Sequence, residues 1–539
     1  MYNYKLAKMK SLTPLISLLF LSIIFFSDAN CNNHVKENFF LCMSTQFKSF
    51  TQSFKIMYTK DSPLYQPLLE SSQQNPRWSN STALKPLLII TPFHESEIQA
   101  AVVCSQKNGL QVRIRSGGHD YEGLSYLSKT PFIIIDLINL RSIDVNLEDE
   151  TAWVQSGATL GELYYAIAKE SEIHGFPAGI CPSVGLGGHL SGGGLGTLVR
   201  KFGLAADNVL DAYLVDSNGK LLDRKSMGED LFWAIRGGGG GSFGIVLSWK
   251  IKLVKIPPIV TGFTVTKTLS QGATWLVYRW QSIVDQLPDD LFIRIIIQNV
   301  GNGDQKTIQT SFNSLFLGRM DELIPLMNER FPELGLKAQD CIEMDWIQSV
   351  MYFAGYQKDQ PIELLLDRKT LYKSSFKGKS DFVKQPIPES GLKGIWERLL
   401  EEDQFVCMIM DPFGGKMNEI PDSETPFPHR KGNMYNIQYL VKWNEDGTNV
   451  SNKHVRWIRM LYRYMRPYVS NSPRAAYINY RDLDLGTNRL GKTSFEEASV
   501  WGTKYFKGNF KRLVQVKNKV DPDNFFRNEQ SIPPLLDLI

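Results

Sequence analysis

Two glycine-rich segments of the chain each contain one nucleophilic side chain. Residues 115–123 read RSGGHDYEG and carry His119, while residues 176–208 begin FPAGICPSVGLGGHLSGGG and carry Cys181. Glycine has no Cβ, so backbone N–H groups in such segments can approach a large, oxygen-rich ligand closely. A lone histidine or cysteine is more often a packing residue, but packing rarely calls for either inside a glycine loop. A cofactor with two electrophilic positions on one ring would suit this nitrogen nucleophile and this thiolate.

Two further motifs match nucleotide-binding patterns by spelling but not by context. Residues 239–244 satisfy GxGxxG, yet they precede an expected strand, whereas a dinucleotide fingerprint follows a strand and opens a helix. Residues 486–493 spell GxxxxGKT, but only 46 residues follow them. That is too few for the parallel sheet that a phosphate-binding loop begins. We therefore expect neither a Rossmann dinucleotide site nor ATP or GTP hydrolysis.

Metal-binding and hydrolase signatures are either missing from the sequence or out of context. It contains no CxxC and no HExxH, and its seven histidines are scattered. Residues 240–244 spell GxSxG, but they precede an expected strand, whereas a nucleophile elbow follows a strand and opens a helix. The sequence therefore predicts no metal site and no serine hydrolase.

Composition places the chain among ordinary globular proteins that bind small molecules. Its 539 residues are 43% hydrophobic and 22% charged, and the formal net charge is +4. That charge is too dilute for a nucleic-acid footprint, and no clustered basic stripe is present. A chain of this length exceeds a single hydrophobic core, so we expect two or three lobes.

The N-terminus has the order of a secretory signal peptide, which we assign to residues 1–29. Three lysines precede an apolar run at 15–26, and Ser27-Asp28-Ala29 offers small residues where a signal peptidase reads. A membrane anchor would need roughly 20 apolar residues, more than this run supplies. Asn80 and Asn449 begin glycosylation triplets that become relevant in the secretory pathway. We expect a mature protein without a membrane span.

Six cysteines in an oxidising compartment usually form disulfides, but here they are unevenly distributed. Cys42 ends an amphipathic segment and Cys104 lies on a helical pattern, so a bridge between them would tie the N-terminus to the first domain. Cys31 falls at the expected cleavage site, and Cys341 and Cys407 are candidates for buried thiols. Cys181 stands apart because proline and glycine flank it.

The order of expected elements indicates an α+β or α/β fold rather than an all-helical one. A capping-box spacing at Thr159 opens a helix, and residues 142–156 and 209–224 have the patterns of paired strands. Strands are predicted at 87–91, 111–115, 132–137, 245–253, 435–443 and 475–482, and helices at 96–107, 160–168, 321–330 and 494–510.

Composition shifts after Pro258 suggest the domain limits. We divide the mature chain into an N-terminal segment at 30–83, a first domain at 84–258 and a second domain at 259–470. The remaining residues, 471–539, are too few to fold alone and are expected to return to the first domain. No internal repeat is present.

Several long motifs resemble the berberine bridge enzyme-like flavoproteins of plants. They are the two glycine segments above, GLAADN, GEDLFWAIRGGGG and the closing DPDNFFRNEQSIPP. The resemblance covers essentially the whole mature chain. It implies a two-lobed FAD-binding domain of the vanillyl-alcohol oxidase type, completed by the C-terminal segment. It also implies an α/β substrate domain whose antiparallel sheet covers the flavin.

The resemblance further implies that FAD is attached at two points. His119 would bond to the 8α-carbon of the flavin and Cys181 to its C6, which fixes the ring and raises its reduction potential. His189 resembles the family histidine that stabilises negative charge near the flavin, although it could instead bond only to the glycine backbone. The other cofactor contacts implied are Arg115, Ser116, Gly117, Gly118, Gly187, Gly188 and Gly192.

Two positions match family sites for the base that takes a proton from the substrate. Glu419, in GGKMNEI, resembles the glutamate of alkaloid-cyclising members, and Tyr480, in NYRDLD, resembles the tyrosine of cannabinoid oxidocyclases and monolignol oxidoreductases. A tyrosine with a pKa near ~10 needs positive charge nearby to act as a base. Arg481 adjoins it, but alternation along a strand would point that arginine to the opposite face. Tyr121 and Gln438 resemble substrate contacts.

Two positions set this chain apart or bear on its electron acceptor. Many relatives read GGGYG where this sequence has Leu195, which argues against a monolignol site and toward an apolar substrate face. Three residues after the flavin cysteine, relatives with a small side chain admit O₂ and those with a bulky one exclude it. Val184 therefore predicts an oxidase that releases H₂O₂.

The leading hypothesis is a secreted, bicovalent FAD oxidase of a plant specialised metabolite, an alkaloid or a prenylated phenolic, with ring closure as an optional outcome of hydride loss. The alternatives are a carbohydrate oxidase of the same family, a redox-neutral cyclisation or cycloaddition catalyst that retains FAD, and a non-catalytic flavin-binding defence or storage protein. Its partners would be the small-molecule substrate and O₂, with a monomeric enzyme in a vacuole, an ER-derived vesicle or the extracellular space.

Overall fold

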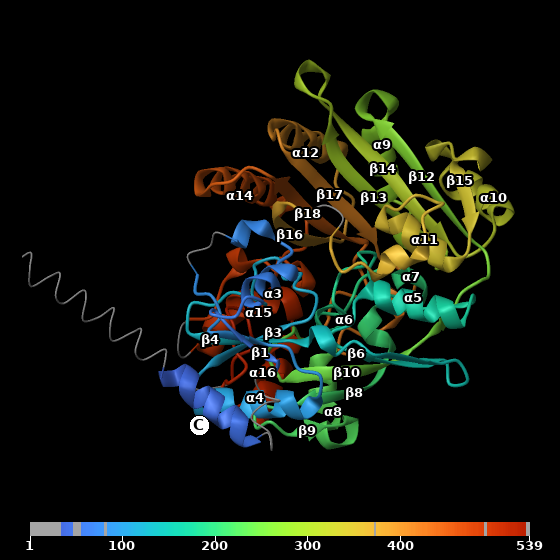
Figure 1. Ribbon diagram of the computed structural model, residues 1–539. Coiled ribbons are helices and arrows are strands. Elements are labelled where there is room, and N and C mark those ends of the chain that lie inside the picture. The colour runs from blue at the N-terminus through green and yellow to red at the C-terminus, as the bar shows by residue number, and fades with distance from the viewer. Residues whose placement is uncertain (1–33, 47–54, 80–82, 371–372, 490–492, 535–539) are drawn as a thin grey trace, which may run out of the picture.

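The computed structural model describes residues 34–46, 55–79, 83–370, 373–489 and 493–534. The expected signal peptide, Cys31 and Asn80 lie outside these residues. Figure 1 shows two lobes, one built on a large sheet with helices behind it and the other on two smaller sheets. No helix in the described part of the chain is both long and apolar enough to cross a bilayer.

A four-stranded sheet positions the first glycine segment. Its strand order is β1-β2-β4-β3, and β2, β4 and β3 run parallel. The apolar strand β4 is buried along its whole length, as expected for a parallel strand covered on both faces. Residues 115–123 begin at the carboxyl end of β3, the edge where ligands bind in open α/β sheets. The elements are β1 (Met57–Thr59), α3 (Tyr65–Ser71), β2 (Leu88–Ile90), α4 (Glu95–Lys107), β3 (Gln111–Arg115) and β4 (Phe132–Asp136).

A five-stranded antiparallel sheet supports the second glycine segment. Its order is β5-β6-β10-β8-β9, and residues of β10 alternate between buried and half-buried positions. The predicted capping box is present, because Thr159 and Glu162 exchange hydrogen bonds at the start of α5. The elements are β5 (Ile143–Asn146), β6 (Thr151–Gln155), α5 (Leu160–Glu170), α6 (Leu186–Ser191), α7 (Val199–Phe202), β8 (Val209–Val215), β9 (Leu221–Leu222), α8 (Arg224–Ile235) and β10 (Ile245–Lys252); β7 (His174–Gly175) pairs separately with β11 (Val254–Lys255).

All strands of the seven-stranded antiparallel sheet fall between residues 260 and 443. Its order is β15-β12-β14-β13-β17-β18-β16. Helices α9, α10, α12 and α14 pack on one face through a core that includes Ile293, Ile295 and Ile297, so the alternate residues of β13 face the other lobe. The strands are β12 (Val260–Thr268), β13 (Leu291–Val300), β14 (Thr307–Phe316), β15 (Cys341–Met344), β16 (Ser375–Val383), β17 (Phe405–Pro412) and β18 (Tyr435–Trp443), and the helices are α9 (Ala273–Gln281), α10 (Met320–Arg330), α11 (Trp346–Ala354), α12 (Glu389–Glu401), α13 (Lys416–Glu419) and α14 (Thr448–Tyr464).

The C-terminal segment returns to the first lobe, beside the elements formed by the N-terminal residues (Figure 1). Helices α15 (Phe495–Phe506) and α16 (Asn509–Val520) share one buried cluster with α8 and β10. The prediction of one helix over 494–510 was wrong, because Lys507 adopts a positive φ of 44° and divides it. The predicted strand at 475–482 was also wrong. Within this stretch Ile478–Tyr480 forms a 3₁₀ turn, and the N–H groups before it bond outside any strand, that of Ala476 to the Lys504 carbonyl and that of Tyr477 to Ser380 Oγ.

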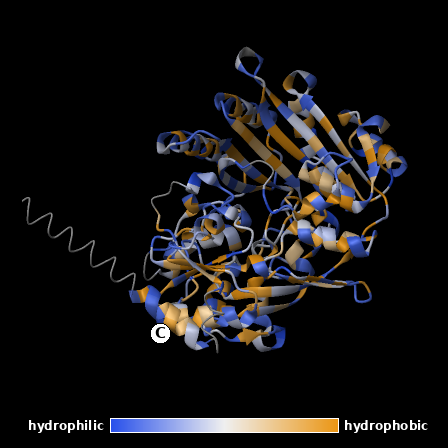
Figure 2. Cartoon of the chain, viewed as in Figure 1, coloured by the Kyte–Doolittle hydropathy of each residue, from blue (hydrophilic) through white to orange (hydrophobic). Residues whose placement is uncertain are grey.

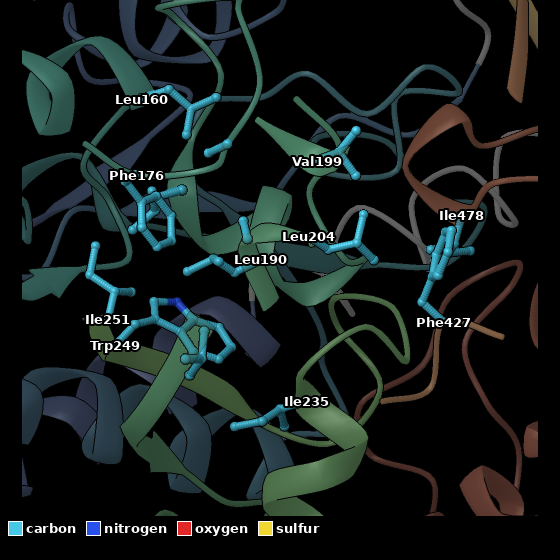
Figure 3. Packing of buried hydrophobic residues seen from close by; sticks show 14 of the residues in the cluster. Leu160, Phe176, Leu190, Val199, Leu204, Ile235, Trp249, Ile251, Phe427 and Ile478 are labelled. Atoms are coloured by element: carbon cyan, nitrogen blue, oxygen red, sulfur yellow. The ribbon is translucent and has the colours of Figure 1, made fainter. Parts of the chain in front are cut away.

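The cores follow from the sequence pattern. Figure 2 shows hydrophobic and hydrophilic residues alternating along strands of the large sheet. Figure 3 shows the largest cluster in close-up, where Leu190 and Trp249 of the first lobe pack in one region with Phe427 and Ile478 from distant parts of the chain. The predicted disulfide between Cys42 and Cys104 is present and joins the helix at 34–46 to α4. Cys407 is a buried thiol as expected, whereas Cys341 is only half-buried.

Candidate active site

A cavity of about 590 Å³ lies where the two lobes meet. Both glycine segments, the inner face of the large sheet and the C-terminal segment supply its walls. Elements more than 300 residues apart in the sequence therefore build one site. The predicted residues that line it are Ser116, Gly117, Gly118, His119, Tyr121, Cys181, Val184, Gly187, Gly188, His189, Leu195, Gln438 and Tyr480.

The two predicted attachment residues converge on one hydroxyl group. Ser183 Oγ lies 3.1 Å from His119 Nε2 and 3.6 Å from Cys181 Sγ. Burial lowers the pKa of His119 to about 4, so its imidazole is neutral and nucleophilic near pH 7. Ser183 itself is buried and was not predicted. Both nucleophiles are thus held within reach of one ligand.

Glycines in the glycine-rich segments around the cavity serve two different purposes. A Cβ on Gly118 would lie 1.7 Å from Ser72 O, and one on Gly192 would lie 1.9 Å from Asn479 Oδ1. Those two glycines permit close packing of protein against protein. By contrast, a Cβ on Gly188 would meet nothing within 4 Å, and one on Gly240 only Ser191 at 3.7 Å. Gly188 and Gly240 both line the cavity, so they leave room for a ligand against the backbone.

Arg115 and Gly192 do not line the cavity, so the structure gives no support to their expected role as cofactor contacts. Arg115 is fully buried, donates to Asp136 at 3.0 Å through Nε and bonds to the carbonyls of Leu68 and Leu69. It ties β3 to β4 and α3. The physical reason is the parallel pairing of Arg115 with Asp136, which the sequence did not indicate.

The rejected GxGxxG segment belongs to the cavity although it is not a Rossmann site. Residues 239–241 precede β10, as expected, and line the cavity together with Arg527 and Asn528 of the C-terminal segment. The cavity therefore carries backbone N–H groups and an arginine at this end, which suit a diphosphate. Ser156 Oγ and Arg481 Nη1, both at the cavity wall, are buried without a hydrogen-bond partner. These features fit FAD.

His189 is hydrogen-bonded within the second glycine segment. Its Nε2 accepts a hydrogen bond from Gly179 N–H at 3.0 Å, and burial lowers its pKa to about 4. The imidazole is therefore neutral and holds the backbone next to Cys181. Asn479 donates to the His189 carbonyl at 3.0 Å, which joins this segment to the C-terminal one.

Aromatic side chains form the part of the cavity expected to hold the substrate. The rings of Tyr121 and Tyr480 stack at a centroid distance of 5.7 Å, and Phe376 meets Tyr121 edge-on at 5.0 Å. Gln438 donates a hydrogen bond to the Tyr121 hydroxyl. Burial raises the pKa of Tyr480 well above its ordinary value, so the phenol is neutral at physiological pH. Leu195 borders the same space.

The inner face of the large sheet adds charged residues that sequence reasoning missed. Residues two apart on a strand share a face, so Gln438, Leu440 and Lys442 of β18 all line the cavity. Arg294 of β13 and Asp411 of β17 do so as well, with Arg294 Nε 3.0 Å from Asp411 Oδ1. Regular alternation along each predicted strand was the signal that could have identified them.

Comparison with known proteins matches the first domain and the C-terminal segment of the chain to two family profiles. An FAD binding domain family profile matches residues 86–224, and a profile described as berberine and berberine like matches residues 476–533. Berberine bridge enzyme-like 22 of Arabidopsis thaliana is 57% identical over 93% of this chain and 95% of its own length. The chain belongs to the berberine bridge enzyme-like family of FAD-dependent oxidoreductases.

Other members of the berberine bridge enzyme-like family carry more specific names. Tetrahydroberberine oxidase of Berberis wilsoniae is 51% identical over 96% of this chain and 97% of its own. Among solved structures, the wild-type grass pollen allergen Phl p 4 is described as a glucose dehydrogenase, with 47% identity, a TM-score of 0.87, and coverage of 93% of this chain and 100% of that one. An isoleucine-to-valine variant of the allergen is described as a glucose oxidase.

One of the two candidate bases lies outside the cavity of this family member. Glu419 ends α13 on the surface, with 60% of its side chain exposed and an ion pair to Lys416 at 2.7 Å. It does not line the cavity, so the structure gives no support to its expected role as a base. Glu419 lies on a short, amphipathic helical turn, and the motif alone did not indicate whether its side chain faces the solvent or the cavity.

Arg481 also differs from expectation. The residues around it form 3₁₀ turns rather than a strand, so alternation does not apply and both Tyr480 and Arg481 line the cavity. Its charge is already paired, because Arg481 Nε lies 2.8 Å from Asp120 Oδ2.

Asn449 is exposed near the start of α14, which leaves the predicted glycosylation there unhindered by burial.

Proposed function

We propose that this enzyme oxidises a hydroxyl-bearing carbon of a carbohydrate. The observation that carries the proposal is the polar inner face of the large sheet, where Arg294, Asp411 and Gln438 reach the cavity beside the stacked tyrosines. Such a wall offers donors and acceptors to several hydroxyl groups, and aromatic rings pack on the C–H faces of a sugar. A structural relative described as a glucose dehydrogenase supports the same class of substrate.

FAD attached through both His119 and Cys181 is the second part of the proposal. Support comes from their convergence on Ser183 and from the neutral state of His119. When bound, FAD supplies the acceptor for the hydride that leaves the substrate carbon. The protein's own contribution is to hold that carbon still: Gln438 fixes the Tyr121 hydroxyl, and the Tyr121–Tyr480 stack borders the reacting space.

Dioxygen is the proposed electron acceptor. Val184 lines the cavity three residues after Cys181, and its small side chain leaves space there. In the pollen allergen, the wild type is described as a dehydrogenase and an isoleucine-to-valine variant as an oxidase. That contrast supports a valine-dependent reaction with O₂, which would release H₂O₂.

Oxidation of an alkaloid or prenylated phenolic is the second candidate function. It is favoured by Leu195 and by the aromatic cage of Tyr121, Phe376 and Tyr480, which suit a flat apolar ring system. Two relatives named tetrahydroberberine oxidase share 49–51% identity with this chain. Ring closure after hydride loss belongs to this candidate.

The cellular compartment and the oligomeric state of the enzyme are also part of the proposal. The Cys42–Cys104 disulfide supports passage through an oxidising compartment, as the N-terminal signal pattern predicts. We propose a secreted or vacuolar monomer.

The deciding experiment is a substrate panel with two readouts. Purified holoenzyme would be mixed anaerobically with mono- and oligosaccharides, tetrahydroprotoberberines and prenylated phenols, while flavin bleaching is followed, and then exposed to air while H₂O₂ is measured. Bleaching by sugars alone supports the proposal, and bleaching by alkaloids or phenols alone replaces it with the second candidate. Product formation without bleaching or O₂ uptake would indicate redox-neutral chemistry, and no response at all would contradict an oxidase.

A further inference from the structure

Asp411 is a carboxylate in the cavity with capacity to accept a proton. It is 4% exposed, and Arg294 is its ion-pair partner. Arg294 Nε lies 3.0 Å from Asp411 Oδ1, and this guanidinium opposes the effect of burial on the carboxyl pKa by its charge and by a hydrogen bond. Within the described residues, no other N–H or O–H donates to this side chain. Because a carboxylate can accept several hydrogen bonds, lone pairs remain for a ligand.

The other cavity carboxylate, Asp120, is already fully engaged. Its Oδ1 accepts the N–H groups of Glu122 and Leu124 at 3.0 and 3.1 Å, and its Oδ2 accepts from Arg481 at 2.8 Å. These three donors occupy both oxygens of Asp120 and fix its loop, whereas Arg294 is the one donor to Asp411 among the described residues.

Tyr480 is poorly suited to take the proton in this setting. Burial is the main reason that its pKa lies well above the ordinary value, and the negative charge of Asp411 raises it further, while Arg294 opposes both. A neutral phenol beside a free carboxylate can donate a hydrogen bond to the substrate oxygen but does not readily lose its own proton. At neutral pH the ionised carboxylate of Asp411, rather than the neutral phenol of Tyr480, is therefore the group that can accept the proton.

We propose that Asp411 is the general base of the reaction, with Arg294 as its positioning residue. This rests on the proposed oxidation of a hydroxyl-bearing carbon. In the step, the C–H and O–H bonds of the substrate break and a C=O bond forms. The hydroxyl proton passes to an Asp411 carboxylate oxygen, and the carbon gives up its hydrogen with both electrons as a hydride. FAD, when bound, would supply the two-electron acceptor for that hydride, so the two-electron oxidation of the substrate would be balanced.

The chemistry of the pair fits this task. Burial raises the pKa of Asp411, which moves a carboxylate toward the range where general bases work best, while Arg294 keeps it ionised and oriented. The groups that face this carboxylate are Arg294 on β13 and Tyr477 and Tyr480 on the C-terminal segment, with neutral Asn436 opposite it on β18. Of these, only Arg294 is charged near neutral pH.

The test compares Asp411→Asn, Tyr480→Phe and a control, Asp403→Asn, in the holoenzyme with any substrate that bleaches the flavin. Asp403 is 79% exposed at the edge of the same sheet, so its loss should leave the rate unchanged. Asp411→Asn should slow anaerobic flavin reduction by about 10²- to 10⁴-fold, and Tyr480→Phe by less than about 10-fold. Formate should restore part of the rate to Asp411→Ala, because it can occupy the vacated space as a base. The reverse ranking of the two variants, or an Asp411→Asn rate equal to wild type, would overturn the proposal.

The pH profile gives a readout that a purely structural role would not move. A base must be ionised, so the reduction rate should fall on acidification through the Asp411 pKa, which burial places above that of an ordinary aspartate. This acid limb should vanish in Asp411→Asn, persist in Tyr480→Phe and move to higher pH in Arg294→Met, since loss of the guanidinium raises the pKa further. An acid limb that survives Asp411→Asn would contradict the assignment.

A substrate-independent measurement separates failure of this assignment from failure of the proposed function. Infrared titration of wild type and Asp411→Asn would detect the protonated carboxyl band of Asp411 without any turnover. A band that titrates well above the ordinary aspartate range and is missing in the variant supports a base of raised pKa even if no panel compound reacts. A band that titrates only at the ordinary value, or no band assignable to this residue, would count against it.

Discussion

At the scale of single residues, the site depends on groups whose surroundings change their ordinary chemistry. Burial leaves the imidazoles of His119 and His189 neutral, but their environments assign them different tasks. His189 uses its Nε2 lone pair to accept a hydrogen bond from Gly179 N–H, whereas His119 contacts the backbone and the hydroxyl of Ser183. A carbonyl only accepts and a hydroxyl can rotate, so neither contact has to use the ring lone pair, and His119 is the available nucleophile.

Attachment of FAD at two points can be tested by substitution. In wild type, all flavin should remain with the polypeptide after denaturation, because two bonds hold it. His119→Ala and Cys181→Ala should each leave one bond, and the double variant should release the flavin completely. Flavin fluorescence in a denaturing gel, with acid precipitation, measures this. Free flavin from denatured wild type would contradict the covalent proposal.

Access of O₂ should depend on the volume of one side chain. Val184→Leu adds a methylene at the cavity wall, so reoxidation of the reduced enzyme by air should slow by at least ~10-fold, while anaerobic reduction by substrate changes little. Stopped-flow reoxidation checks this, with Val500→Leu on the exposed face of α15 as the size-matched control. Equal reoxidation rates for Val184→Leu and the control would show that the size of residue 184 does not control access of O₂.

At the scale of elements, β16 connects the two lobes through both of its faces. One face meets the cavity, where Gly378 lies so close to Tyr121 that a Cβ would come within 2.7 Å of the ring. The other face carries Lys377 and Lys379, both almost fully buried. Lys377 bonds to Glu122 and, at 2.6 Å, to Asp482, the residues that follow Tyr121 and Arg481. The strand therefore sets the relative position of the two stacked tyrosines.

Loss of the buried charge on β16 should be costly. Lys377→Met removes the cation that bonds to both Glu122 and Asp482 and leaves Asp482 with Lys379 alone, and breaking such a buried pair typically costs about 3–5 kcal/mol. Arg459→Met removes a cation from the same network, but at its 54% exposed end, where an ion pair contributes ~1 kcal/mol or less. Denaturant or thermal unfolding of the two variants measures the difference. Similar losses of stability would show that the network does not act as a buried cluster.

At the scale of the whole molecule, the last part of the chain completes the first lobe. Lys517 of α16 is fully buried and donates to the carbonyls of Ser242 and Phe526 and to the Asp521 carboxylate, at 2.6–2.7 Å. Ser242 adjoins the glycines at 239–241 that line the cavity. The C-terminal segment thus fixes a loop that is nearly 300 residues away in sequence, and it also supplies Tyr480 and Arg527 to the site.

Removing this link should loosen the loop before it unfolds the protein. Lys517→Met leaves two buried carbonyls without a donor and the Asp521 carboxylate without its ion pair. Hydrogen exchange at residues 238–245 should accelerate by at least ~10-fold, since each 1.4 kcal/mol of lost local stability is a factor of ten. Lys519→Met, at an exposed position of the same helix, is the control. Unchanged exchange in Lys517→Met would show that the loop is held independently.

Local patterns were enough to predict much of this protein. Strand β3, strand β18 and the capping box of α5 match their predictions closely, because alternation and capping depend on neighbouring residues. The Cys42–Cys104 disulfide and the family assignment also follow from the sequence. The two glycine segments were identified as walls of a site because glycine has no Cβ, so a segment rich in glycine lets its backbone approach a ligand closely.

Only the tertiary structure decided which side chains meet. Glu419 and Tyr480 looked equivalent as motifs, but one lies on the surface and the other at the cavity. Residues 475–482 read as a strand, yet the Tyr477 N–H bonds to Ser380 Oγ instead of to a neighbouring strand, and Arg481 pairs with Asp120. Asp411 meets Arg294, 117 positions away in the sequence, through strand pairing. Sequence patterns report how a residue relates to its neighbours along the chain, whereas a site is made by contacts between segments that only folding brings together.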